Sequence, residues 1–175
     1  MRVDHIAYRV SDRNKTSKFL SEAFGYKIED DFEIDFGDGK FARCYAMIPP
    51  EKTIKDLPFN HSIITPLAEY HRPAEIFVSE GTDGSIVYNW VKERGGIGGI
   101  HHIAYQVESV QEVMDDWKNK NLASFTTEAP ITSEDLIQCF TNPHPLTGVI
   151  YEFIERKNKG FNISNVKKLM ESTED

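Results

Sequence analysis

Cysteine is scarce in this chain of 175 residues, which contains only Cys44 and Cys139. Neither lies in a CxxC or zinc-ribbon pattern, so we interpret both as small apolar side chains on strands. A disulfide framework and a cysteine zinc cluster are therefore not expected. The thiols are predicted to be free, as is usual in the cytoplasm.

Long apolar runs and basic blocks are also missing. No segment approaches the roughly 20 apolar residues of a membrane-spanning helix, and residues 1–10 lack the apolar core of a signal peptide. The formal charge of −8 repels phosphate backbones, and the Lys and Arg residues are scattered. We therefore expect a cytoplasmic protein with a small-molecule substrate and with no nucleic-acid or membrane partner.

An internal repeat is the most informative feature of the sequence. Residues 4–10 read DHIAYRV and residues 101–107 read HHIAYQV, with five identical positions. His5 and His102 occupy the same place in the two copies, 97 positions apart. The repeat predicts that the chain consists of two related halves.

The segments that follow the two copies also match. Ser11 and Ser109 are good N-caps for helical patterns, and Gly25 is placed to end the first helix. Strand-like runs then follow at 26–35, 40–48 and 73–80 in the first half, and at 122–127, 135–141 and 147–155 in the second. The pattern predicts an α+β fold with two tandem βαβββ modules.

We expect a single domain over residues 1–175. Module one covers 1–95 and carries an inserted, proline-rich loop at 49–72, which has no counterpart in the second half. A short helix and a glycine-rich connector lead into module two at 98–156, and a C-terminal helix is predicted at 162–172.

Two histidines and one carboxylate suggest a metal site. A lone histidine on a strand is more often structural, but His5 and His102 lie in duplicated units and can meet at a pseudo-twofold axis. Glu152 lies between Tyr151 and Phe153 on an apolar strand, where a buried carboxylate needs a partner. This ligand set is typical of non-heme Fe(II) and also accepts Co, Mn, Ni or Zn. His101 is expected to point away from His102 and not to be a ligand.

The number of ligands is left open by these patterns. Glu75 matches Glu152 when the two last strands of the halves are superposed, which would make Glu75 a fourth ligand. Glu80 is a weaker candidate at the end of the same strand. Whether the first half supplies one ligand or two separates the functions considered below.

These motifs resemble the vicinal oxygen chelate superfamily, most closely the C-terminal catalytic half of 4-hydroxyphenylpyruvate dioxygenase. The resemblance rests on GGIGGIHHIAYQV, on LIQCFTNP, on IYEFIER and on GFNISNVKKLMES. The segments IHHIAYQV and 148–152 are also similar to methylmalonyl-CoA epimerase. The resemblance implies an open barrel around the metal site, closed by the C-terminal helix.

The resemblance also implies roles for individual residues. His5, His102 and Glu152 would be the iron ligands. Gln138 would hydrogen-bond the substrate, and Phe140 and Phe161 would stack on its ring. Further substrate-binding positions are Phe77 and Ser79, which replace a proline and an asparagine of the family, and Asn165 in the terminal helix. In the same alignment Phe77 occupies the usual fourth-ligand position, two residues from Glu75, which favours three ligands.

Three functions remain as hypotheses. The first is an Fe(II) dioxygenase that uses O₂ and an α-keto acid. The second is a metal-dependent epimerase or glyoxalase-like isomerase or lyase, with Glu75 as ligand or base. The third is a non-catalytic small-molecule binder of the same fold. A homodimer is compatible with each of them, although the sequence shows no interface.

Overall fold

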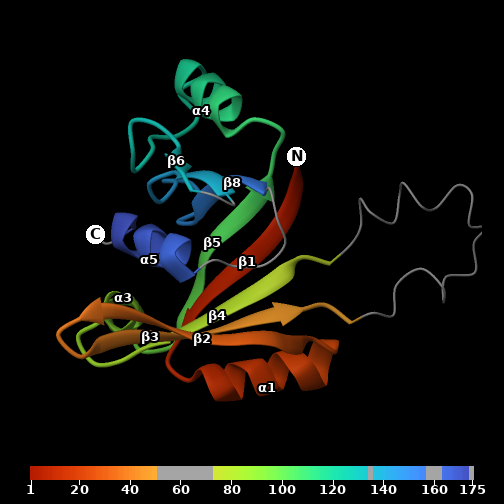
Figure 1. Ribbon diagram of the computed structural model, residues 1–175, viewed down its shortest axis with the longest axis vertical. Coiled ribbons are helices and arrows are strands. Elements are labelled where there is room, and N and C mark those ends of the chain that lie inside the picture. The colour runs from red at the N-terminus through yellow and green to blue at the C-terminus, as the bar shows by residue number, and fades with distance from the viewer. Residues whose placement is uncertain (51–72, 134–135, 157–162, 174–175) are drawn as a thin grey trace, which may run out of the picture.

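The computed structural model describes residues 1–50, 73–133, 136–156 and 163–173 (Figure 1). The predicted insertion at 49–72 lies outside this part except for its first two residues. In chain order the elements are β1 (Arg2–Val10), α1 (Arg13–Phe24), β2 (Lys27–Gly37), β3 (Lys40–Ile48), β4 (Glu75–Gly81), α3 (Ile86–Glu93), β5 (Gly98–Gln106), α4 (Val110–Asn119), β6 (Ile131–Thr132), β7 (Leu136–Phe140), β8 (Ile150–Arg156) and α5 (Ile163–Ser172).

The strands form one mixed sheet that curls into an open half-barrel (Figure 1). Its order is β2-β3-β4-β1-β5-β8-β7-β6. In the first half β1 runs parallel to β4, and in the second half β5 runs parallel to β8. The two halves meet where β1 pairs with β5 in antiparallel orientation. The α+β fold of two repeated modules is therefore confirmed, with the two histidine strands side by side at the centre.

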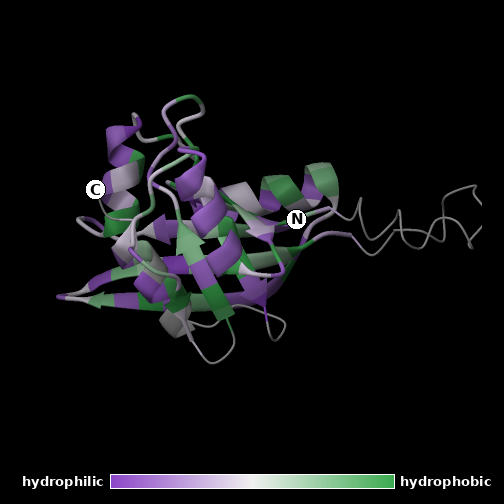
Figure 2. Ribbon diagram, turned by 90° about the horizontal axis from the view of Figure 1, so that it is seen from above, coloured by the Kyte–Doolittle hydropathy of each residue, from purple (hydrophilic) through white to green (hydrophobic). Residues whose placement is uncertain are grey.

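The helices cover different faces of the sheet. Strand residues alternate between faces, and on β4 Ile76 and Val78 join the cluster that contains Leu20 of α1. Phe77 points the other way and joins the cluster that contains Met170 of α5. Hydrophilic and hydrophobic residues accordingly alternate along the strands in Figure 2. Helix α5 thus lies on the concave face of the first half, opposite α1.

The first helix of each half, α1 and α4, begins with the same kind of capping contacts. Asp12 caps α1 and Ser109 caps α4, each through its side chain. Ser11 was expected in the first case, but the helix begins one residue later. Glu80 at the end of β4 accepts a hydrogen bond from the first backbone N–H of α1, and Glu155 at the end of β8 does the same for α4. The carboxylate of Glu80 thus caps the start of α1.

One predicted strand is wrong. The run 122–127 contributes only an isolated bridge between Phe125 and Thr141, and the second strand of the second half is instead the short β6. Leu122 is 44% exposed in this run, and only Phe125 packs against the core of the second half. The C-terminal helix is confirmed to within one residue as α5.

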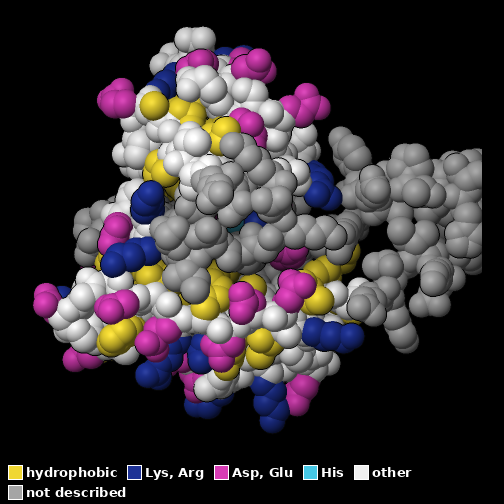
Figure 3. All heavy atoms as spheres, viewed as in Figure 1, with side chains coloured by type: hydrophobic (Ala, Val, Ile, Leu, Met, Phe, Trp, Pro, Cys, Tyr) yellow, Lys and Arg dark blue, Asp and Glu magenta, His cyan; other side chains and the backbone are white. Residues whose placement is uncertain are grey.

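The surface is mixed in charge. On the face shown in Figure 3, acidic and basic side chains are interspersed over the described elements. Among the described helices, none has the length and apolar character needed to cross a membrane.

Candidate metal centre

Matched bulges shape the centre of the sheet. In β1, two residues lie between Val3 and Ile6, whereas the facing stretch of β5 has only one. In β5, one extra residue lies between the partners of Ala7 and Tyr8, which are consecutive in β1. The extra residues fall at Asp4–His5 and at His101–His102, which are equivalent positions of the repeat. A bulge interrupts the alternation of side chains. Consecutive side chains therefore reach the same side of the sheet at both places.

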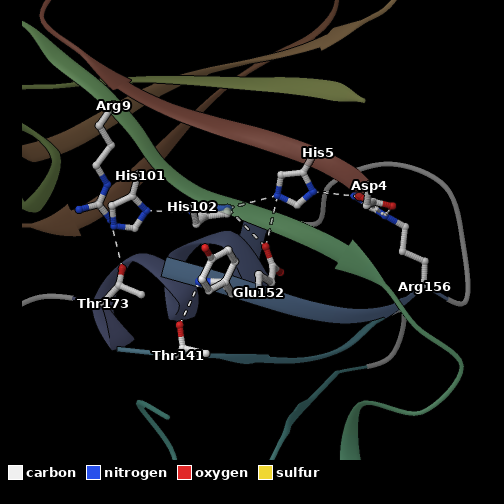
Figure 4. Close-up of polar contacts among 10 residues, drawn as sticks. Asp4, His5, Arg9, His101, His102, Thr141, Glu152, Arg156 and Thr173 are labelled. Atoms are coloured by element: carbon white, nitrogen blue, oxygen red, sulfur yellow. Dashed lines mark hydrogen bonds and ion pairs between the residues drawn. The ribbon is translucent and has the colours of Figure 1, made fainter. Parts of the chain in front are cut away.

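Three donor atoms converge at these bulges (Figure 4). His5 Nε2 lies 3.2 Å from His102 Nε2, and each of these nitrogens lies 3.3 Å from Glu152 Oε2. Three ligands at about 2.1 Å from one metal ion lie about 3.0 Å apart in an octahedral face and about 3.4 Å apart in a tetrahedron. The observed spacing therefore fits a shared divalent metal ion.

Glu152 has an environment that requires a cation. It lies on β8 opposite Ala104 of β5 and is 2% exposed. Its Oε2 atom accepts no hydrogen bond in the described part of the chain, although both histidine nitrogens are at ion-pair distance. A buried carboxylate without hydrogen bonds is costly unless a positive charge compensates it.

The two histidines differ electrostatically. Burial favours the neutral form of His5, but the hydrogen bond with Asp4 and the carboxylate of Glu152 at ion-pair distance outweigh burial and raise its pKa to about 9. Burial lowers the pKa of His102 well below its usual value, and the positive charges of His5 and Arg9 lower it further. One proton thus resides on His5, between two carboxylates, where a divalent cation could replace it.

Each ligand histidine has a neighbour at its other ring nitrogen. His5 Nδ1 lies 2.9 Å from Asp4 Oδ1, and His102 Nδ1 lies 2.9 Å from His101 Nδ1. Arg156 donates to Asp4 through Nε at 3.0 Å and through Nη2 at 2.6 Å. The prediction that His101 points away from His102 is wrong, because the bulge turns it to the same side.

Strand register settles which residue matches Glu152. Ala7 faces Phe77 in the first half, and its repeat equivalent Ala104 faces Glu152 in the second. Phe77 therefore occupies the position in the first half that is equivalent to Glu152, and it packs against Phe32. Glu75 lies two residues earlier, opposite His5. It is half-buried, and burial raises its pKa.

Of the remaining predicted site residues, some are placed by the structure and others lie outside its described part. Gln138 and Phe140 of β7 are buried on the same side as Glu152, and the ring of Phe140 meets that of His102 edge-on at 5.9 Å. Ser79 is buried on β4, where its hydroxyl donates to the carbonyl of Tyr8. Phe161 and the side chain of Asn165 lie outside the described residues.

Three residues near the centre were missed by the sequence analysis. Asp4 was visible as the repeat partner of His101, but the alternation of a regular strand placed it on the other face. Arg156 is the last residue of the Glu152 strand. Arg9 is buried at 3% exposure, donates to Thr173 at 3.2 Å and lies 5.8 Å from the ring centre of Trp90.

The sequence was compared with protein families and with known proteins, and both comparisons found matches. The profile of the Glyoxalase/Bleomycin resistance protein/Dioxygenase superfamily matches residues 4–140. Mitochondrial methylmalonyl-CoA epimerase of Mus musculus is 23% identical over 152 residues, which are 86% of this chain and 71% of the epimerase.

Solved structures share the fold. A selenomethionine methylmalonyl-CoA epimerase matches with a TM-score of 0.63 and 20% identity, over 90% of this chain and 97% of the epimerase chain. A variant of 4-hydroxymandelate synthase from Streptomyces coelicolor matches with a TM-score of 0.72 and 18% identity. This match covers 99% of the present chain and 53% of the synthase chain. The Streptomyces coelicolor epimerase bound to 2-nitronate-propionyl-CoA gives a TM-score of 0.59 at 17% identity, over 93% and 99% of the two chains.

Proposed function

The chain belongs to the glyoxalase/bleomycin resistance protein/dioxygenase superfamily, and on this basis we propose that it is a divalent-metal enzyme, namely an Fe(II)-dependent dioxygenase that acts on an α-keto acid. His5, His102 and Glu152 would hold the metal ion. When bound, Fe(II) would supply the redox chemistry for O₂ and a positive charge for the keto acid.

The observation that carries the proposal is the three-donor centre with Phe77 at the fourth position. Two histidines and one carboxylate on one side of the ion leave three coordination positions open. A keto acid needs two of them for its carboxylate and carbonyl oxygens, and O₂ needs the third. A fourth protein ligand would leave too few positions for this chemistry.

The surroundings of the centre suit a flat, partly polar substrate. Phe140 beside His102 and the pair Phe32–Phe77 provide aromatic walls on the two halves. Gln138 is 3% exposed and lies on the same side of the sheet as Glu152. A buried amide of this kind can orient a polar group of the substrate.

Epimerase chemistry is the second candidate, because Glu75 offers a carboxyl group beside His5. Burial raises the pKa of this carboxyl group, which suits proton transfer at neutral pH. The inward positions of β3 provide no other acid, since they are Ala42, Cys44 and Ala46. Epimerisation by the described residues would therefore depend on Glu75.

The test is an anaerobic titration of the Fe(II)-loaded protein with α-keto acids, including 4-hydroxyphenylpyruvate. A new visible absorption band and O₂ consumption that depends on the keto acid are expected. His102→Ala should lose iron and both signals, whereas His144→Ala, a histidine outside the centre, should retain them. Retained iron and turnover in His102→Ala would contradict the assignment.

A second measurement addresses the epimerase. If iron binds but no keto acid gives a band, exchange of the C2 hydrogen of methylmalonyl-CoA with solvent deuterium should be followed. Exchange that Glu75→Gln abolishes, at unchanged metal content, would favour the epimerase over the dioxygenase.

A further inference from the structure

We infer that Asp4 and His101, the residues before the two ligand histidines, are positioning residues that determine which ring nitrogen each histidine presents to the metal. The inference rests on the proposed metal centre and deepens it. It assigns a role to the residue pairs Asp4–His5 and His101–His102, in which the first member holds the second.

The backbone makes these contacts possible. In a regular strand the residue before an inward histidine points to the opposite face. Both histidine strands have an extra residue at this point, opposite the small side chains of Ala104 and Ala7. The same irregularity at equivalent positions of the two halves brings each preceding side chain to 2.9 Å from Nδ1 of its histidine.

Metal binding through Nε2 requires one tautomer of each histidine, and these contacts can hold that tautomer. His5 and His102 meet Glu152 through Nε2, so metal binding requires the lone pair at that nitrogen. The ring hydrogen must then be on Nδ1. Asp4 Oδ1 accepts it from His5, and His101 Nδ1 accepts it from His102. A partner at the second nitrogen fixes ring orientation and raises the basicity of the ligand.

Burying the polar ring of His101 costs free energy, and packing alone does not explain why a histidine is present here. When its Nδ1 accepts a hydrogen bond, its own hydrogen lies on Nε2. That atom is buried and has no hydrogen-bond partner in the described part of the chain. The ring meets Trp90 edge-on, with centroids 5.4 Å apart. An apolar ring would fill this place without a buried N–H, so the acceptor nitrogen is the feature that accounts for histidine here.

The two positioning residues differ in charge. Asp4 is an anion held by the guanidinium of Arg156, while His101 acts as a neutral acceptor. His5 therefore has the more strongly polarised imidazole. The centre is symmetric in its backbone and asymmetric in the strength of its two nitrogen ligands.

The experiment measures metal binding and the ring protonation state directly. Two-bond ¹H–¹⁵N spectra of the Zn(II)-loaded protein should show His5 and His102 protonated at Nδ1 and ligated through Nε2. In Co(II) titrations, His101→Phe should weaken binding by about 10–100-fold and change the visible spectrum. His101→Asn, which restores an acceptor, should recover most of the affinity, and Asp4→Asn should retain more affinity than Asp4→Ala. His144→Phe is the matched control and should behave as wild type.

The outcomes separate the two proposals. If the wild type binds neither Co(II) nor Zn(II), the metal centre and this inference fall together. If it binds them and folded His101→Phe binds Co(II) with unchanged affinity and spectrum, only this inference falls. If His101→Phe does not fold, the spectra of the wild type decide. An Nε2–H signal from His102 in the Zn(II)-loaded protein would overturn the inference.

Discussion

Single residues decide the charge of the centre. His5 lies between Asp4 and Glu152, and against the effect of burial these two carboxylates raise its pKa to about 9. His102, at the equivalent position, has its pKa lowered by burial first and then by the charges of His5 and Arg9. Identical residues in a repeated motif therefore differ in protonation, because their neighbours differ.

This difference predicts how the stability of the metal-free protein depends on pH. The pKa of His5 is higher in the folded state, at about 9, than its ordinary value of 6.5. Its proton therefore stabilises the fold fully below pH 6.5, and this stabilisation is lost as the pH rises through about 9. Thermal unfolding in a chelator should show a falling midpoint over this range. His5→Gln should flatten the decrease, and an equal slope in wild type and variant would contradict the prediction.

Phe77 offers a second prediction at this scale. Phe77→Glu would add a carboxylate at the position equivalent to Glu152. In a chelator the variant should lose about 2–4 kcal/mol of stability, because it buries a charge. With Zn(II) it should recover more stability than the wild type gains. Phe77→Leu is the control, and an equal gain with Zn(II) in both variants would show that position 77 does not reach the metal.

At the scale of elements, the same capping arrangement starts α1 and α4. Glu80 and Glu155 lie at the ends of β4 and β8 and accept from the first backbone N–H of each helix. The carboxylates also face the positive ends of the helix dipoles. These contacts tie each helix to the last strand of its own half.

We expect Glu155→Gln and Glu80→Gln each to destabilise the protein by about 1 kcal/mol, because a charged acceptor is replaced by a neutral one. The two losses should add, since the sites belong to different halves. Urea unfolding measures both. Glu128→Gln, at an exposed position, is the control, and a similar loss in the control would show that net charge rather than capping is responsible.

The order of elements could be predicted from the sequence because the repeat and the apolar periodicity are local signals. The bulges could not be predicted, since one extra residue in a strand leaves the composition unchanged. This is why His101 was assigned to the wrong face and Asp4 was missed. The role of Glu80 was also hidden, because its partner Arg13 is 67 residues away in the chain. The convergence of His5 and His102 could be predicted, because duplication marks both histidines.

At the scale of the whole molecule, α5 completes the first half. Val166 and Met170 are 5% and 3% exposed and join the cluster with Phe77 and Cys44 on the concave face. The C-terminal helix therefore covers apolar surface that belongs to strands near the start of the chain. Its packing links the two ends of the sequence.

Met170→Ala should lower the free energy of unfolding by about 2–5 kcal/mol, the usual cost of truncating a buried methionine. The measurement is denaturant unfolding followed by far-UV circular dichroism. Lys168→Ala, on the exposed side of α5, should change little. An equally small effect of Met170→Ala would mean that α5 does not contribute to the core in solution.

The antiparallel seam between β1 and β5 has a consequence for chain topology. The metal centre beside this seam takes donors from His5 of β1, near one end of the sequence, and from Glu152 of β8, near the other. A metal ion held by both closes most of the chain into a loop, as a disulfide between distant cysteines does. Cys44 and Cys139 are free. Metal loading should stabilise the folded chain, because the ion binds the folded state and, unlike a covalent disulfide, is released on unfolding.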